Sequence, residues 1–177
     1  CALPILMRLI QQVLEFRKVE SGNLKICVSY GDISSFLRSC AEAFIPLLGK
    51  RRQLLSFEST PDIIFGFFDA DKLDKIVYNL LSNAAKYTPE GGQICVRAAL
   101  ADEYTLQIDV TNTGELMTQK TIDGLFKRFY EGDYRRHNTI GTGIGLALVK
   151  DLVALHHGTI EAFSNEQTGN CFRIMLP

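Results

Sequence analysis

The spacing of apolar side chains predicts a long amphipathic helix in the middle of the chain. Asp69 is placed to cap its N-terminus, and Asp71 and Asp74 follow near the positive end of the helix dipole. The segment 88–92, which reads TPEGG, ends the helix because proline and paired glycines do not continue it. One stripe is apolar at helical spacing: Leu73, Ile76, Val77, Leu80, Leu81 and Ala84.

The rest of the chain alternates between strand and helix periodicity. Apolar residues space as a helix over 6–16, and this stripe is either half of a helical hairpin or packs on the chain's own core. The order of elements predicts a two-layer α/β sandwich, in which helices cover one face of a mixed sheet. The other predicted elements are a strand at 24–30, a helix at 32–52, strands at 54–59 and 63–68, a hairpin at 93–100 and 104–111, a helix at 141–157, and a closing hairpin at 158–164 and 171–176.

Two of these regions carry more detailed predictions. The helix at 32–52 is expected to kink at Pro46. Its inward side chains are predicted to be Phe36, Leu37, Cys40, Ala43, Phe44 and Leu47. Residues 112–140 show no strand pattern, and loops of this length are usually functional lids or disordered. An apolar island inside this loop is suited to docking on the core: Leu125, Phe126, Phe129 and Tyr130.

Composition narrows the class of protein. The 177 residues allow one domain of ordinary size, or one domain with a short appendage. A net charge of −1 argues against a nucleic-acid partner and against a polybasic membrane patch. The five cysteines are scattered without a Cys-x-x-Cys pair, which favours reduced thiols in the cytoplasm. No apolar run is long enough to span a membrane. Because the chain begins with Cys, we expect a fragment of a longer protein, and the sequence is compatible with membrane attachment of that parent.

The polar face of the central helix carries candidate chemistry. Asn79, Asn83 and Lys86 follow one another at i, i+4 and i+7, so they lie along one edge of the helix. Carboxamide oxygens are hard ligands that suit Mg²⁺, and a neighbouring ammonium suits phosphate. The alternative is that these residues only form the solvated face of an amphipathic helix.

Glycine-rich segments supply two further candidates. Residues 141–150 read GTGIGLALVK and open the last predicted helix, where uncovered N–H groups and the helix dipole favour phosphate. No strand directly precedes them and no Gly-Lys-Ser/Thr follows, so neither a dinucleotide fold nor a P-loop is indicated. Asn112-Thr-Gly114 ends a strand, where an amide can read the edge of a base. The alternatives are a hinge in the first case and an ordinary turn in the second.

The order of these motifs resembles the ATP-binding catalytic domain of sensor histidine kinases, in the GHKL superfamily with gyrase B, Hsp90 and MutL. NLLSNAAKYTPEGG resembles the N box, LFKRFYEGD the F box and GTGIGLALVK the second glycine box of that domain. The resemblance implies a Bergerat-type ATP-binding fold for residues 23–177. It also implies that residues 1–22, which contain VLEFRKVESG, are the end of the dimerisation and phosphoacceptor hairpin. Among these kinases, the sequence most resembles that of the large hybrid sensors, which join kinase and receiver domains.

The resemblance assigns roles at a site for ATP and Mg²⁺. It makes Asn83 the Mg²⁺ ligand with Asn79 beside it, and it brings Lys86 to the phosphates. Related ATPases carry at the position of Asn79 a Glu that activates water; an amide cannot accept that proton, so ATP is kept for transfer rather than hydrolysed. The resemblance further implies that the loop 115–140 closes as a lid anchored by Phe126 and Phe129. The remaining implied nucleotide contacts are Tyr87, Asn112, Gly114, Gly141, Thr142, Gly143, Ile144, Gly145 and Leu146.

Three positions depart from the family pattern. The first glycine box usually reads Asp-x-Gly-x-Gly, whereas this chain has Asn112 for the Asp and Leu116 for the second Gly. An amide oxygen still accepts a hydrogen bond from adenine, but the loss of charge assistance costs about 1 kcal/mol or more. Asn170 stands where Thr or Ser is common. These changes lower the expected nucleotide affinity and leave the phosphate residues in place.

The resemblance implies a protein histidine kinase that presents the γ-phosphate of Mg·ATP to a histidine on another domain of the same parent. That acceptor is absent here, because His137, His156 and His157 all lie in the ATP-binding portion. We therefore expect no autophosphorylation by this chain alone, a homodimeric parent, and onward transfer to a receiver domain of a response regulator. The alternative is a degenerate scaffold with weak or no ATP binding. A serine kinase or a GHKL ATPase is disfavoured by Asn79.

Overall fold

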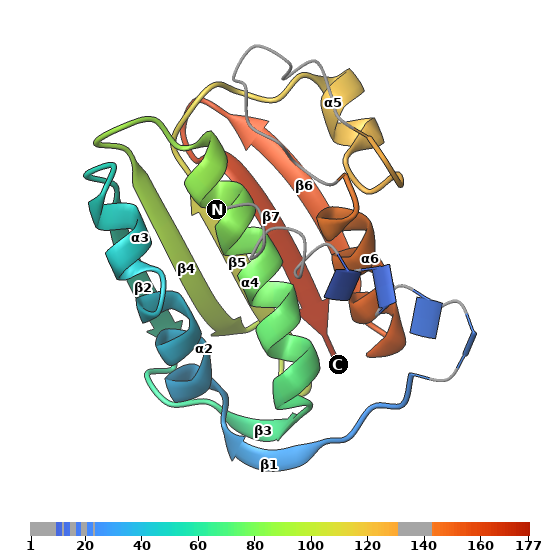
Figure 1. Cartoon of the computed structure of the whole chain (residues 1–177). Helices are drawn as coiled ribbons and strands as arrows, with labels where there is room; N and C mark the ends of the chain where they lie inside the picture. The colour runs from blue at the N-terminus through green and yellow to red at the C-terminus, as the bar shows by residue number, and fades with distance from the viewer. Residues whose placement is uncertain (1–9, 12, 15–16, 19–20, 23, 131–142) are drawn as a thin grey trace.

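The computed structural model describes residues 10–11, 13–14, 17–18, 21–22, 24–130 and 143–177. A five-stranded sheet carries α2, α4 and α6 on one face, and a separate two-stranded sheet lies beyond one end of α4 (Figure 1). The predicted α/β sandwich is therefore confirmed. The elements are β1 (Ser29–Asp32), α2 (Ile33–Glu42), α3 (Ile45–Gly49), β2 (Leu54–Thr60), β3 (Phe65–Phe68), α4 (Ala70–Tyr87), β4 (Gln93–Leu100), β5 (Leu106–Asn112), α5 (Gln119–Gly124), α6 (Gly145–Leu155), β6 (Thr159–Asn165) and β7 (Gly169–Leu176).

The main sheet is mixed, with the order β2-β4-β5-β7-β6. β2 and β4 are parallel, and the other neighbours are antiparallel. Parallel neighbours need a crossover connection, which α4 supplies on its way from β3 to β4. α4 is thereby held against the middle of the sheet. Among the residues described, no helix is both long and apolar enough to span a bilayer.

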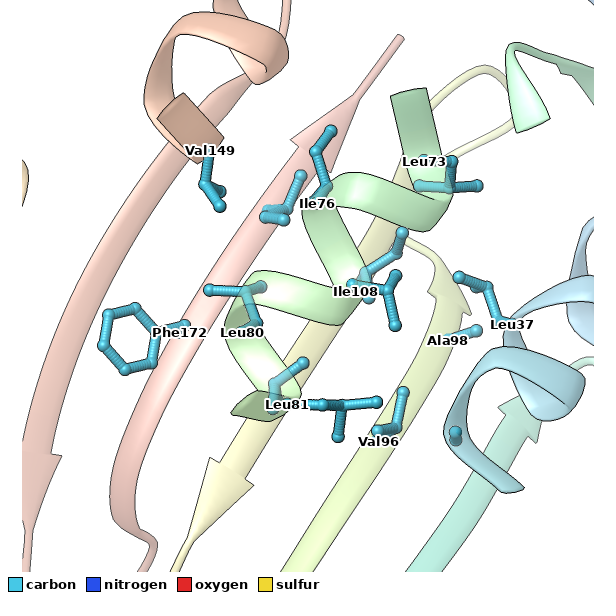
Figure 2. Close-up of a cluster of buried hydrophobic side chains, with 14 of the residues drawn as sticks. Leu37, Leu73, Ile76, Leu80, Leu81, Val96, Ala98, Ile108, Val149 and Phe172 are labelled. Atoms are coloured by element: carbon cyan, nitrogen blue, oxygen red, sulfur yellow. The ribbon is translucent and has the colours of Figure 1, made fainter. Parts of the chain in front are cut away.

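The apolar stripe of α4 forms the centre of the core (Figure 2). Its side chains pack against the sheet and against the flanking helices α2 and α6. Truncation of a fully buried leucine to alanine typically costs about 2–5 kcal/mol, so this packing fixes the orientation of α4 firmly. The labelled core residues are at most 3% exposed: Leu37, Leu73, Ile76, Leu80, Leu81, Val96, Ala98, Ile108, Val149 and Phe172.

The prediction of one kinked helix over 32–52 is wrong. α2 ends at Glu42, and α3 begins at Ile45 with Pro46 in its first turn. Proline is tolerated there because the first N–H groups of a helix have no intrahelical partner. The new helix has its own phase, so Leu48 is buried, whereas Leu47, which was predicted to face inward, is 50% exposed. Ala43 is exposed as well.

Other boundaries also differ from the predictions. The strand predicted at 24–30 begins only at Ser29, because only β1 pairs with β3, and β3 begins at Phe65 rather than at residue 63. Within 112–140, where no element was predicted, the structure has α5. The last helix runs from Gly145 to Leu155, shorter than the predicted 141–157, and residues 141–142 lie outside the described residues.

The face of the sheet opposite the helices carries one row of alternating charge. Five side chains are neighbours across the five strands in the order Glu58, Arg97, Asp109, Arg173 and Glu161. Arg97 Nη2 lies 2.8 Å from Glu58, and Arg173 donates two hydrogen bonds of 2.8 Å to Asp109. This row makes the uncovered face of the sheet compatible with water, so a single layer of helices is sufficient.

Candidate functional site

The polar edge of α4 lies beside its buried stripe, and Asn79, Asn83 and Lys86 are all half-buried. Asn79 Nδ2 donates to the carbonyl of Lys75 at 2.7 Å, one helical turn back. Asn83 forms no hydrogen bond within the described residues, so its carboxamide oxygen is available to a ligand. Lys86 Nζ lies 4.9 Å from the centre of the Tyr87 ring. The four predicted residues therefore follow one another along the C-terminal half of the helix.

Gly114 brings the turn after β5 against the end of α4. A Cβ at Gly114 would lie 2.8 Å from the carbonyl oxygen of Tyr87, and the backbone φ of Gly114 is +149°. Both the space and the backbone angle therefore require glycine. The fold thus brings residues 112–114, the predicted base-reading turn, against the helix that carries the predicted Mg²⁺ ligand, although the two are separated in the sequence.

Asn112 is the last residue of β5 and is 4% exposed. Its side chain lies on the helix-covered face, because Ile108 and Val110 precede it at alternating, buried positions of the same strand. Asn112 Nδ2 donates to the carbonyl of Thr113 at 3.0 Å. Within the described residues, Asn112 Oδ1 has no hydrogen-bond partner. A buried acceptor without a partner is costly, so this oxygen points to a bound ligand that carries a donor.

The second glycine motif forms the start of α6. Gly143 has φ +63°, and its carbonyl accepts a hydrogen bond of 2.9 Å from the N–H of Phe129. A Cβ at Gly143 would lie 2.9 Å from Phe129 Cα, so glycine permits this close approach. Ile144, at the N-cap of α6, forms no side-chain cap, and no side chain among the described residues accepts from the N–H groups of Gly145 and Leu146, which suits them to an anion. Gly141 and Thr142 lie outside the described residues.

The two helices meet on the same face of the sheet. α4 and α6 pack against each other and run in opposite directions, so the C-terminal half of α4 and the N-terminus of α6 point to the same end of the domain (Figure 1). β5 also ends there, at Asn112. The polar edge of α4, the base-reading turn and the uncapped start of α6 therefore lie at one end of the domain, as a nucleotide site requires.

The two phenylalanines predicted to anchor the loop behave differently. Phe126 is half-buried, and its ring packs edge-on against Phe172 of β7 with 6.3 Å between the ring centres. The ring of Phe129 is 73% exposed. Phe129 has φ +57° and contacts Gly143 through its backbone rather than its ring. Phe126 thus attaches this part of the chain to the sheet by its side chain, and Phe129 attaches it to the glycine turn by its main chain.

Comparison with known proteins identifies the family. Residues 68–177 match the family described as histidine kinase-, DNA gyrase B-, and HSP90-like ATPase. The chain belongs to this family. Histidine kinase P4 of Formosa agariphila is 33% identical over 176 residues, which cover 97% of this chain and 13% of P4. Within the family, the chain therefore corresponds to the catalytic domain of sensor histidine kinases, and it spans only a small part of this relative's length.

Two solved structures share the fold. Full-length ShkA, in complex with AMPPNP, superposes with a TM-score of 0.85 at 24% identity and covers 97% of this chain and 35% of ShkA. ThkA, in complex with the response regulator TrrA, gives a TM-score of 0.78 at 18% identity and covers 99% of this chain and 48% of ThkA. At these identities the likeness establishes the fold of the histidine kinase catalytic domain and not the details of its site.

The donor set of this histidine kinase domain limits how a metal ion is held. Among the described residues, no group of three or more His, Cys, Asp or Glu side chains converges as a metal site. Mg²⁺ usually keeps several waters and takes one or two protein ligands together with substrate phosphates. A single carboxamide oxygen from Asn83 fits that mode, and the part of the chain that the structure describes offers no cage of carboxylates.

Sequence reasoning missed one feature of the site, a polar row at the end of the core. Asn112 of β5, Asn170 of β7 and Ser164 of β6 are direct cross-strand neighbours on the helix-covered face. The preceding row on that face is apolar, with Val110 and Phe172 buried. The sequence contained a signal, because a polar residue closes an otherwise apolar alternation in each of the three strands, but only the register of the sheet aligns them.

Proposed function

We propose that this domain binds Mg·ATP between the C-terminal half of α4 and the N-terminus of α6. On this proposal it presents the γ-phosphate to a histidine of a dimerisation domain in the parent protein. The observation that supports this best is the buried Oδ1 of Asn112, which has no hydrogen-bond partner among the described residues and directly precedes the turn that Gly114 brings against Tyr87. Adenine has an exocyclic amino group that donates to such an acceptor.

The proposed roles follow from the chemistry of each group. Asn83 supplies a hard oxygen for Mg²⁺, and Lys86 supplies a cation for the phosphates. The uncapped N–H groups at the start of α6 complete the anion site. Magnesium, when bound, supplies neutralisation of phosphate charge. Asn79 cannot accept a proton from water, so the site favours transfer over hydrolysis, and catalysis consists mainly of positioning and electrostatics.

The partners belong to the same proposal. The acceptor histidine lies on a helix of the parent that is paired with residues 1–22, which form the end of the dimerisation hairpin, and the parent is a homodimer. The next partner is the receiver domain of a response regulator, which the complex of ThkA with TrrA supports by analogy. A cytoplasmic location for this domain follows from its use of ATP, whether or not the parent is anchored to a membrane.

Calorimetric titration with AMPPNP tests this function. The wild type should bind AMPPNP more tightly with Mg²⁺ than with EDTA, and Asn83→Ala should lose most of that difference. Ser82→Ala, a half-buried neighbour on the same helix, is the matched control and should behave as the wild type. Equal losses with and without Mg²⁺ would refute the ligand role of Asn83. No heat at millimolar nucleotide would favour the alternative, a degenerate scaffold, which the changes at Asn112 and Leu116 support.

A further inference from the structure

Asn170 is a buried polar residue near the start of β7, and the proposed chemistry does not use it. It is 4% exposed. Its Oδ1 accepts a hydrogen bond of 2.7 Å from Ser164 Oγ and one of 3.3 Å from the N–H of Met117. Its Nδ2 donates to the carbonyl of Glu115 at 3.0 Å. Both ends of the carboxamide are therefore engaged, which leaves the Oδ1 of Asn170 without the free capacity that Asn112 has.

These bonds fix the chain that follows the base-reading turn. Glu115 and Met117 lie immediately after Gly114 in a segment without helix or strand. The backbone groups of such a segment are positioned only by the partners they find outside it. Here those partners are Asn170 and Ser164, whose Oγ also accepts from the N–H of Met117 at 3.0 Å. The turn is thus held by Tyr87 on one side and by the β6–β7 hairpin on the other.

The same hairpin also fixes the residue before the turn. Asn112 and Asn170 are direct cross-strand partners. Gly169 has φ +71°, and a Cβ there would lie 2.5 Å from the carbonyl oxygen of Asn112. The start of β7 therefore lies in close contact with the backbone of Asn112. Since Asn112 is neutral, its hydrogen bond to a base lacks charge assistance and depends on correct direction and distance.

We propose that Asn170 is a positioning residue for the nucleotide base: it clamps Glu115 and Met117 so that Asn112 Oδ1 is held where an exocyclic amino group can reach it. The inference rests on the proposed function and concerns the base alone. The phosphate groups lie with α4 and α6, which Asn170 does not contact through any hydrogen bond in the described residues. The clamp therefore contributes to selection of adenine over a base with a carbonyl at the same position.

The test separates base binding from phosphate binding. Affinities for ATP, GTP and tripolyphosphate, each with Mg²⁺, are measured for the wild type and for Asn170→Ala. The variant should bind ATP about tenfold more weakly, because a buried hydrogen-bond network of this kind is worth about 1.4 kcal/mol or more. Its affinities for tripolyphosphate and for GTP should stay within about twofold, because GTP carries a carbonyl where adenine carries its amino group. Its preference for ATP over GTP should therefore fall by about the same tenfold factor.

Two further variants keep the test decisive. Asn170→Asp has the same shape and keeps both acceptor bonds but turns a carboxylate oxygen toward the carbonyl oxygen of Glu115, so its loss of ATP preference should be at least as large as that of alanine. Asn165→Ala is the matched control, because Asn165 makes three hydrogen bonds within the same hairpin and none to residues 115–117. Its preference for ATP over GTP should equal that of the wild type.

Amide hydrogen exchange gives a readout that needs no nucleotide. The N–H of Met117 should be protected in the wild type and should exchange faster in Asn170→Ala. If both variants of Asn170 lose ATP and tripolyphosphate binding by the same factor, or keep the wild-type preference for ATP, the positioning role is wrong while the proposed function stands. If the wild type binds none of the three ligands, the proposed function fails and the base-positioning role fails with it. Exchange at Met117 that stays unchanged even in the double variant Asn170→Ala/Ser164→Ala, which removes both acceptors of this N–H, would show separately that the clamp itself does not exist.

Discussion

Replacement of Gly114 by alanine tests the contact between the base-reading turn and α4. The new Cβ would lie 2.8 Å from the carbonyl oxygen of Tyr87, at a position whose φ of +149° side chains rarely adopt. Backbone strain of this kind costs about 1–3 kcal/mol. The contact adds about 1–3 kcal/mol, because the carbonyl belongs to a helix that is packed firmly against the sheet and cannot yield easily. We expect a total loss of about 2–6 kcal/mol in the free energy of unfolding.

Two other glycines separate the two contributions. Gly91 has φ +73° but open space around a Cβ, so Gly91→Ala should show strain alone, about 1–2 kcal/mol. Gly49 is the last residue of α3, has no positive φ and also has open space. Gly49→Ala should therefore stabilise the domain by about 0.5–1 kcal/mol, since alanine loses less backbone entropy on folding.

Urea denaturation of the three variants measures these differences, and titration with AMPPNP measures their effect on the site. Gly114→Ala should also weaken AMPPNP binding by tenfold or more, because relief of the contact moves the turn away from Tyr87. A tenfold loss of affinity corresponds to about 1.4 kcal/mol of binding free energy. Gly91→Ala and Gly49→Ala should not change it. If Gly114→Ala is no more destabilised than Gly91→Ala and binds AMPPNP normally, the argument that this contact builds the site is wrong.

Three further predictions concern stability and reactivity. Burial raises the pKa of Asp69, but hydrogen bonds and the nearby charge of a lysine outweigh it, so the pKa lies below 3.8 in the folded state. The ionised carboxylate stabilises the fold fully at pH values above 3.8, and this stabilisation disappears as the pH falls through the lower pKa of the folded state. Asp69→Asn should therefore lower the free energy of unfolding in urea by about 1–3 kcal/mol at pH 7 and by progressively less in acid. A loss that does not change with pH would contradict this. Asp109→Asn should destabilise more than Glu58→Gln, because only Asp109 is buried; equal losses would contradict the geometry. Burial raises the pKa of Cys171 to about 12, whereas Cys27 is exposed, so a thiol reagent followed by peptide mass spectrometry should label Cys27 before Cys171 in the native domain.

Local pattern was sufficient to predict α4 and the sheet that supports it. The apolar stripe of α4 keeps helical spacing along its length, and its capping residue Asp69 does accept a hydrogen bond from the N–H of Lys72. The break between α2 and α3 was missed because Pro46 fits either a kink or the first turn of a new helix. The alternation over 24–28 suggested a strand, but a strand needs a partner, and β3 pairs only with 29–32.

The residues of the site could be selected from the sequence, but their arrangement could not. The polar edge of α4 and the glycines before α6 could be predicted because each is contained in one short motif. The contact between Gly114 and Tyr87 depends on the crossover that places α4 over the sheet, and the bonds of Asn170 depend on the register of β5, β7 and β6. Register and crossover are properties of segments far apart in the chain, and spacing within one segment does not reveal them.

The segment that leads into β1 is held more firmly than its irregular backbone suggests. Residues 24–28 form neither helix nor strand, yet the N–H of Cys27 donates to Asp69 Oδ2 at 2.7 Å. The same carboxylate accepts from the N–H of Lys72 in the first turn of α4. Asp69 therefore links this segment to the first turn of the helix. A displacement of residues 24–28 therefore acts directly on the N-terminal end of α4, the helix whose C-terminal half carries Asn83.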